Sequence, residues 1–228
     1  MKTNLILIMT LIATATMANP LLSKYNTPYG TIPFNQIETK HYLPAFKEAM
    51  KIHQKEVDNI INNKQKPTFQ NTIAALENAG RMLNQVSSPF YNLLSSETSD
   101  ELQKIAEEVS PIMSEHSNAI LLNEKLFARV KAVYDMRDKL KLSVEDSRLL
   151  EKTYDGFADN GANLSASDKE IYRELSKEMS MLTLQFGQNV LKETNKWTLL
   201  IKDKNLLAGL PQDVLDMLAL NAKNAGKE

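Results

Sequence analysis

Apolar residues recur every three or four positions over most of this chain, and that spacing limits the possible folds more than any other feature. Between residues 42 and 190 the recurring positions form successive stripes, each on one face of an α-helix. The first stripe consists of Leu43, Phe46, Met50, His53, Val57 and Ile60. Such faces leave water by packing on one another, so the chain is predicted to be mainly α, an antiparallel multi-helix bundle.

Capping residues and prolines divide the stripes into separate helices. After Pro67, a second helix is predicted to carry the apolar positions Ile73, Leu76, Gly80, Leu83, Phe90 and Leu94 without a break. The predicted N-caps of the later helices are Ser99, Asn123, Ser143 and either Ser165 or Ser167. Pro111 is expected to kink or divide the helix that Ser99 opens. The residues expected to be well buried include Leu83, Val109, Leu182 and Phe186.

The periodicity changes near the C-terminal end. Residues 196–202 read Lys-Trp-Thr-Leu-Leu-Ile-Lys, and this β-favouring composition predicts one short β segment. Pro211 is predicted to start a last helix. The organisation expected beyond the N-terminus is therefore an extended arm (19–40), a helical domain (41–195), and the start of a further, truncated region (196–228).

Residues 1–18 have the pattern of a signal peptide. Lys2 precedes an apolar stretch over residues 5–12, and Thr16 and Ala18 are small residues suited to cleavage before Asn19. The apolar stretch is shorter than the roughly 20 residues of a membrane span. The mature protein is therefore expected to be periplasmic or secreted, without a membrane anchor.

The composition excludes several function classes. The 27 Lys and Arg residues balance 28 Asp and Glu residues and are scattered among them, which argues against a nucleic-acid-binding surface. The absence of cysteine removes thiolate nucleophiles and cysteine-bound zinc. None of the seven glycines belongs to a dinucleotide, phosphate-loop or nucleophile-elbow motif.

The three histidines do not form a recognisable metal motif. His53 and His116 each fall on an apolar stripe, where a core or boundary histidine is more common than a metal ligand. Glu38 and His41 have the Glu-x-x-His spacing of di-iron bundles, but those sites need two such motifs on facing helices. Pro44 also places His41 at a helix start. We therefore expect no catalytic, cofactor-binding or metal-ligating residue in this chain.

Two further patterns are weaker indications of a ligand. Asp159 and Glu170 occupy the first and twelfth positions of a calcium-loop spacing, but Leu164 stands where such a loop needs glycine. A helix-ending loop is the favoured interpretation. Met179 and Met181 could belong to a methionine-rich peptide groove, although core filling is the commoner use of methionine.

Several strings follow one another along the chain in a definite order. They are Asn19-Pro20-Leu21-Leu22, Tyr25-Asn26-Thr27-Pro28-Tyr29-Gly30, His41-Tyr42-Leu43-Pro44-Ala45-Phe46, Pro67-Thr68-Phe69-Gln70-Asn71-Thr72-Ile73, Gly161-Ala162-Asn163-Leu164, Leu182-Thr183-Leu184-Gln185-Phe186 and Leu207-Ala208-Gly209-Leu210-Pro211. Taken together, they resemble the N-terminal region of bacterial peptidyl-dipeptidases, which are zinc metallopeptidases of the thimet-oligopeptidase type. The resemblance covers essentially everything after the predicted signal peptide.

The resemblance implies a parent enzyme that hydrolyses short oligopeptides and releases C-terminal dipeptides. It also implies a monomeric parent whose N-terminal half forms one wall of a peptide channel. In that family zinc is bound by a His-Glu-x-x-His helix of the C-terminal half, together with a further glutamate. This chain contains no such motif, so it is expected to bind no zinc and to be inactive alone. The alternative is a stand-alone periplasmic helical domain that binds peptides or a protein partner without catalysis.

Overall fold

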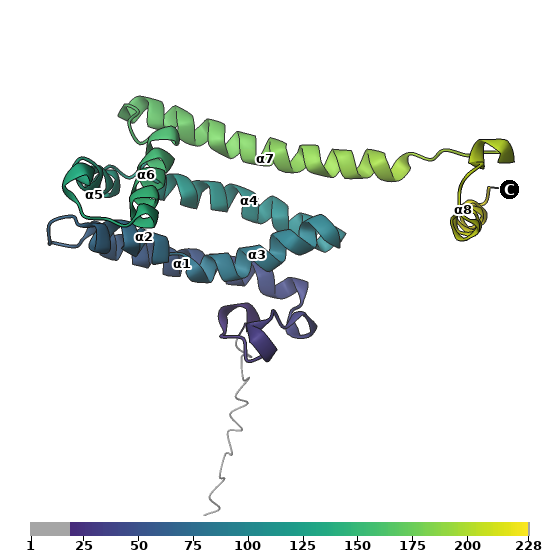
Figure 1. Cartoon of the computed structure of the whole chain (residues 1–228), viewed down its shortest axis with the longest axis horizontal. Helices are drawn as coiled ribbons and strands as arrows, with labels where there is room; N and C mark the ends of the chain where they lie inside the picture. Colours follow the sequence, from purple (N-terminus) through teal and green to yellow (C-terminus); the bar gives the residue numbers. More distant parts are fainter. Residues whose placement is uncertain (1–18, 228) are drawn as a thin grey trace, which may run out of the picture. The chain divides into compact units, whose positions relative to one another are not determined.

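The computed structural model of the chain describes residues 19–227, and these residues are mainly helical (Figure 1). The predicted signal peptide lies outside the described residues. The helices are α1 (Tyr42–Ile61), α2 (Ala75–Asn78), α3 (Arg81–Ser96), α4 (Asp100–Leu121), α5 (Glu124–Tyr134), α6 (Val144–Asp159), α7 (Ala166–Lys196) and α8 (Gln212–Asn224). A π-helical turn (Phe69–Ala74) leads into α2. By its contacts the chain divides into two compact units, with the boundary between Leu182 and Thr183 inside α7.

The segment before α1 is a series of 3-10 turns rather than a regular helix or strand. These turns are Pro20–Leu22, Pro28–Gly30, Phe34–Gln36 and Thr39–His41. Hydrogen bonds hold the segment to the helices. The Asn19 side-chain amide donates to the His41 carbonyl at 2.7 Å, and the Gln85 amide donates to the carbonyls of Leu21 and Ser23 at 2.8 and 2.9 Å. The Leu21 side chain is fully buried.

The core of the first unit surrounds α1, which packs against α3, α4 and α5. At one end of the core the rings of Tyr42, Phe46 and Phe90 are in contact, with centroids 5.1 and 5.2 Å from that of Phe90. At the other end, α5 and α6 join the π-helical turn in a second apolar cluster. Leu83 and Val109 are buried, as the sequence predicts.

The second predicted helix is broken, contrary to expectation. Gly80 has φ +76°, a left-handed conformation that ends α2 and turns the chain into α3. The stripe from Ile73 to Leu94 therefore spans two helices, because glycine at a stripe position ends a helix as readily as it continues one. Pro111 does not divide its helix, because α4 runs from Asp100 to Leu121 as a single helix.

The predicted N-caps are present. The side-chain oxygens of Ser99, Asn123 and Ser143 accept hydrogen bonds from backbone N–H groups three residues later, at 3.0–3.2 Å. Of the two candidates before α7, Ser165 is the cap, because its hydroxyl oxygen accepts from the Asp168 N–H at 3.2 Å. These bonds satisfy backbone donors that a helix start leaves free.

α7 contacts the rest of the first unit through polar groups near its start and near residue 180. The Lys169 ammonium meets Glu124, the Tyr172 hydroxyl donates to Asn160, and the Ser110 hydroxyl donates to the Ser180 carbonyl. In the first unit the apolar residues Ile171, Leu175, Met179 and Leu182 of this helix are exposed. The prediction that Leu182 is buried is therefore wrong, because no other element of the first unit covers this face of α7.

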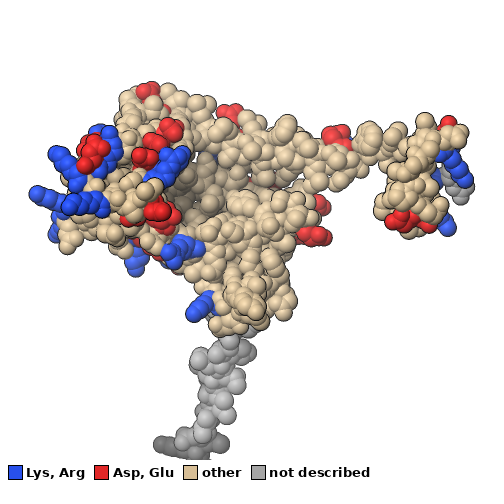
Figure 2. Space-filling view, in the orientation of Figure 1, with Lys and Arg blue, Asp and Glu red and all other residues tan. Residues whose placement is uncertain are grey.

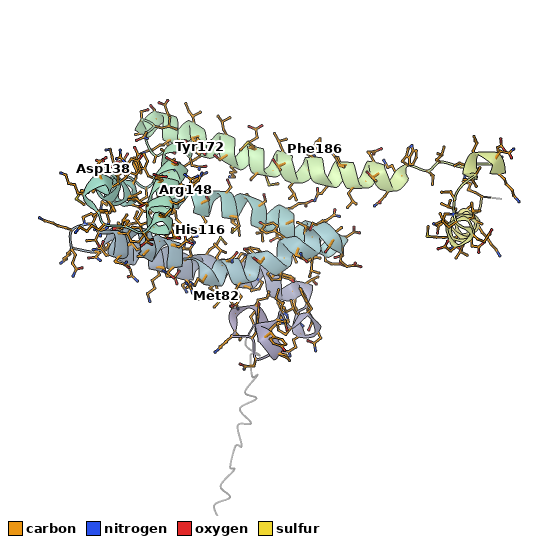
Figure 3. The ribbon with its side chains drawn as sticks, viewed as in Figure 1. Met82, His116, Asp138, Arg148, Tyr172 and Phe186 are labelled. Atoms are coloured by element: carbon orange, nitrogen blue, oxygen red, sulfur yellow. The ribbon has the colours of Figure 1, made fainter. Side chains whose placement is uncertain are left out.

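The second unit holds the end of α7, a 3-10 turn (Lys204–Leu207) and α8. Phe186, labelled on α7 in Figure 3, is 70% exposed, so its predicted burial is also wrong. The predicted β segment at residues 196–202 is also wrong, since residues 19–227 contain no strand. A strand needs a neighbour for its backbone groups, and the described residues supply none. α8 does begin directly after Pro211, as predicted.

None of the helices between residues 19 and 227 is both long and apolar enough to span a membrane. On the face shown in Figure 2, basic and acidic side chains are interspersed, most densely over α5 and α6. That face therefore has no broad surface of a single charge.

Candidate functional site

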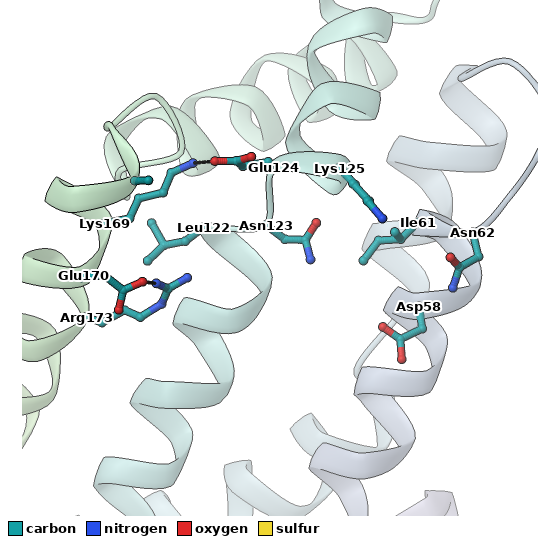
Figure 4. Close-up of a pocket in the computed structure, with 11 residues that line it drawn as sticks. Asp58, Ile61, Asn62, Leu122, Asn123, Glu124, Lys125, Lys169, Glu170 and Arg173 are labelled. Carbon is teal, nitrogen blue, oxygen red and sulfur yellow. Dashed lines mark hydrogen bonds and ion pairs between the residues drawn. The ribbon is translucent and has the colours of Figure 1, made fainter.

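An open cleft lies in the first unit where four helix ends meet (Figure 4). The end of α1, the connection from α4 to α5 and the first turns of α7 line a hollow of about 490 Å³. Most of the lining is polar. Its residues are Asp58, Ile61, Asn62, Leu122, Asn123, Glu124, Lys125, Ala166, Lys169, Glu170 and Arg173.

The charges in this cleft largely neutralise one another. The buried Lys169 ammonium lies 3.2 Å from the carboxylate of the exposed Glu124, an ion pair that joins α7 to α5. Arg173 pairs with Glu170 one helical turn away. The arrangement ties α7 to the other helices, but it presents neither a nucleophile beside a base nor converging metal ligands.

His53 and His116, which are 63 positions apart in sequence, are brought together between α1 and α4. Nε2 of His116 lies 3.0 Å from Nδ1 of His53, within hydrogen-bond distance, and the ring centroids are 5.0 Å apart. Both side chains are partly buried. Figure 3 labels His116 on α4. The pair therefore connects two core helices. Because both imidazoles can be neutral, the two facing nitrogens form a hydrogen bond without a buried charge.

Burial favours the neutral form of this pair. It lowers the pKa of His53, and the nearby Glu56 carboxylate opposes that effect in part. Burial also lowers the pKa of His116, and the charge that His53 would carry lowers it further. An imidazolium in this position loses hydration, and the Glu56 carboxylate compensates for that loss only in part.

The corner at Gly80 packs directly on this pair. The Gly80 N–H donates to the Glu56 carboxylate at 2.8 Å, which links α1 to the start of α3. A Cβ atom at Gly80 would lie 3.1 Å from ring atoms of His53. Glycine is therefore required here for its left-handed backbone and for its small size.

The described residues do not assemble a metal site. Between residues 19 and 227, no three or more His, Asp or Glu side chains converge in a way that could hold an ion. His41 is used locally, because its Nδ1 accepts from the Glu38 N–H at 2.9 Å and Glu38 pairs with Lys40. The Glu-x-x-His spacing there closes a 3-10 turn.

The calcium-like spacing forms the connection between α6 and α7. The Asn160 amide donates to the Gly156 carbonyl at 2.8 Å, and Gly161 has φ +87°. Glu170 pairs with Arg173 on α7 and does not return to the loop. This geometry is that of a helix-ending loop. Met179 is 66% exposed, and Met181 is also exposed, so neither fills a core within the described residues.

Sequence reasoning missed Arg129, a buried arginine on α5. Its guanidinium donates to the carbonyls of Asn63 and Gln65 at 2.9 and 3.3 Å, and to the side-chain oxygens of Asn71 and Thr72 at 3.1 and 3.3 Å. All four acceptors are neutral. The available signal was a cation inside the apolar stripe of α5, at a position where a hydrophobic residue would be expected.

No protein-family model matches the chain. The chain is similar to the dipeptidyl carboxypeptidase of Escherichia coli (strain K12), with 38% identity over 211 residues that cover 92% of this chain and 31% of the relative. The dipeptidyl carboxypeptidase of Salmonella typhimurium is 37% identical over 92% of the chain. Oligopeptidase A of Escherichia coli is 30% identical over 93% of the chain and 30% of the relative.

These similarities confirm the resemblance to the N-terminal region of thimet-oligopeptidase-type peptidases that the sequence strings indicate. The chain spans about a third of the length of the curated relatives that it matches.

Proposed function

We propose that this chain is the N-terminal, non-catalytic part of a zinc metallopeptidase that hydrolyses short oligopeptides and releases C-terminal dipeptides. The similarity to dipeptidyl carboxypeptidase carries the proposal, because it extends along 92% of the chain at 38% identity. The same similarity involves only 31% of that relative. The described fold therefore corresponds to one portion of a polypeptide about three times as long.

The zinc and the reacting groups are assigned to the rest of that polypeptide. The described residues do not fit a zinc site, because they contain no converging set of ligands. The His-Glu-x-x-His motif of the family that the chain resembles is also absent from the sequence. In this proposal the chain forms one wall of the peptide channel. It contributes no group that exchanges protons or electrons with the substrate.

The exposed apolar surface of α7 supports this role. In the first unit, Ile171, Leu175 and Met179 lie four positions apart on one helical face and are 58%, 59% and 66% exposed. Large apolar side chains gathered on one face mark a surface that another protein segment covers. In the parent enzyme we expect that segment to come from the catalytic part.

The same exposed face also favours a second function. A stand-alone helical protein could bind a peptide or protein partner along this face of α7, as in helix-and-groove recognition. The two functions differ in what completes the surface, which is the same polypeptide in the first and a separate molecule in the second.

A chimera separates the two functions. In the Escherichia coli dipeptidyl carboxypeptidase, the stretch similar to this chain is replaced by residues 19–228. The assay measures dipeptide release from an N-blocked peptide with a free C-terminus, by mass spectrometry. The same peptide with an amidated C-terminus is the substrate control, and the relative with the stretch deleted is the protein control.

We expect the chimera to release dipeptides from the free peptide, and the deletion variant to release none. A chimera that is folded and contains zinc but shows no activity would refute the proposal. Binding of the same peptides by the isolated chain would then identify the stand-alone function.

Export to the periplasm or beyond is part of the proposal and has its own test. We expect the mature protein, purified from its native source, to begin at Asn19 and to elute as a monomer. An N-terminus at Met1 would refute the export proposal.

A further inference from the structure

The histidine pair connects two core helices through a bond that requires an unprotonated ring nitrogen. Nδ1 of His53 and Nε2 of His116 are 3.0 Å apart, so one must donate and the other accept. A neutral imidazole has one donor and one acceptor nitrogen, whereas an imidazolium has two donors. The state of the bond therefore depends on how many protons the pair carries.

We propose that His53 and His116 form a proton-sensitive latch, which holds α1 against α4 at neutral pH and opens as the medium becomes acidic.

Double protonation reverses the sign of the interaction. With one proton bound, an imidazolium can still donate to its neutral neighbour. With two, both facing nitrogens carry hydrogens, no acceptor is left, and two positive charges lie within contact distance. The rings separate because they gain hydration and lose repulsion when α1 and α4 move apart.

The groups around the pair compensate little of the positive charge that a doubly protonated pair would carry. On α1, the Glu56 carboxylate is the group that opposes the lowering of the pKa of His53, and it is already bonded to the Gly80 N–H. From α4, His116 itself faces the ring of His53. The corner before α3 presents the backbone of Gly80, and the neighbouring Arg81 donates to Asn78. The buried cation of α5 is Arg129, which is bonded to its four neutral acceptors.

The sign of the pH dependence follows from the direction of the pKa shifts. Burial lowers the pKa of both histidines in the folded chain. The unfolded chain therefore binds protons more readily near the ordinary histidine value of about 6.5. The stabilisation is complete above that value and is lost progressively as the pH falls below it.

The backbone amide of Gly80 provides a second observable for the opening, independent of the NMR signals of the two rings. The His53 ring packs against Gly80, and Glu56, one turn further along α1, holds the Gly80 amide. A movement of α1 away from α4 disturbs this face of α1 and exposes that amide to exchange. Opening of the latch should therefore lower the hydrogen-exchange protection of Gly80.

The experiment compares the full chain (residues 19–228) with three variants between pH 7.5 and 5.5. The variants are His116→Gln, His53→Gln/His116→Gln and, as a matched control outside the pair, His41→Gln. The denaturant midpoint is measured by circular dichroism, and the Gly80 amide by NMR exchange corrected for the intrinsic rate. On acidification, the denaturant midpoint and the exchange protection of the Gly80 amide should both fall in the wild type and in the His41 variant. In the double variant both quantities should fall clearly less.

A ring titration in the wild-type chain keeps the proposal testable if the double variant does not fold. The Cε1 protons of His53 and His116 should titrate below the ordinary histidine value of about 6.5, in the same interval in which Gly80 loses protection. Titration of both rings at the ordinary value would overturn the latch. Protection at Gly80 that does not change with pH, or a double variant with the full wild-type response, would overturn it as well.

Discussion

Replacement of Arg129 by methionine tests whether the buried guanidinium is essential to the first unit. Methionine keeps most of the length and apolar volume of the side chain but removes all four hydrogen bonds. The bonds to the Asn63 carbonyl at 2.9 Å and the Asn71 side chain at 3.1 Å are well formed. The other two are 3.3 Å long and contribute less.

The magnitude follows from these two bonds. A hydrogen bond with a charged partner contributes about 1.5–3 kcal/mol, and the lower value applies because removal of the charge also removes its desolvation cost. The variant should therefore lose about 3 kcal/mol of unfolding free energy. This is a large fraction of the 5–15 kcal/mol that is usual for a domain.

The assay is urea unfolding followed by far-UV circular dichroism, with the slope of the transition compared between variants. Arg148→Met is the matched control, because Arg148 is exposed and its contact with Glu151 lies on the same helix. The control should change the unfolding free energy by less than about 0.5 kcal/mol. An equally small loss for Arg129→Met would refute the reasoning, since it would mean that water replaces the guanidinium at no cost.

Three further predictions use matched positions or the whole chain. Gly80→Ala should destabilise the fold by about 1–2 kcal/mol, because alanine disfavours φ +76° and its Cβ would crowd His53. Gly187→Ala is the matched control for thermal unfolding and should be neutral or stabilising, because open space surrounds Gly187. Phe90→Ala should lower the unfolding free energy by about 3–5 kcal/mol through the cavity it leaves, and Phe186→Ala by less than about 0.5 kcal/mol. Similar losses for the two variants in denaturant unfolding would mean that Phe186 is buried. Elemental analysis of the purified, tag-free chain should find no stoichiometric zinc, and bound zinc at one ion per chain would contradict the absence of a ligand set.

Local signals in the sequence predicted the helix starts well. Asn123 and Ser143 each accept a hydrogen bond from a backbone N–H three residues later. This interaction involves only a few neighbouring residues, so the sequence alone is enough to predict it. The break at Gly80 was missed because periodicity treats glycine as a neutral position, while its left-handed conformation depends on contacts with α1.

Long-range features could not be predicted from periodicity. A stripe shows which face of a helix is apolar but not what lies opposite, so Leu182 and Phe186 were predicted to be buried and are exposed. The β-favouring composition after Lys196 likewise says nothing about a partner strand. His53 and His116 were each placed correctly on a helix face, yet their pairing depends on how α1 and α4 pack.

The neutral surroundings of Arg129 make the junction between α5 and the loop before α2 insensitive to the ionic composition of the medium. Its four acceptors are amide and hydroxyl oxygens, which have no proton to gain in mild acid. Dissolved salt screens the attraction between exposed charges with a screening length of about 10 Å at 0.1 M, but the guanidinium at this site has no oppositely charged partner whose attraction could be screened. The stability of this junction should therefore not depend on salt, whereas exposed ion pairs such as that between Lys131 and Asp135 are weakened as the salt concentration rises.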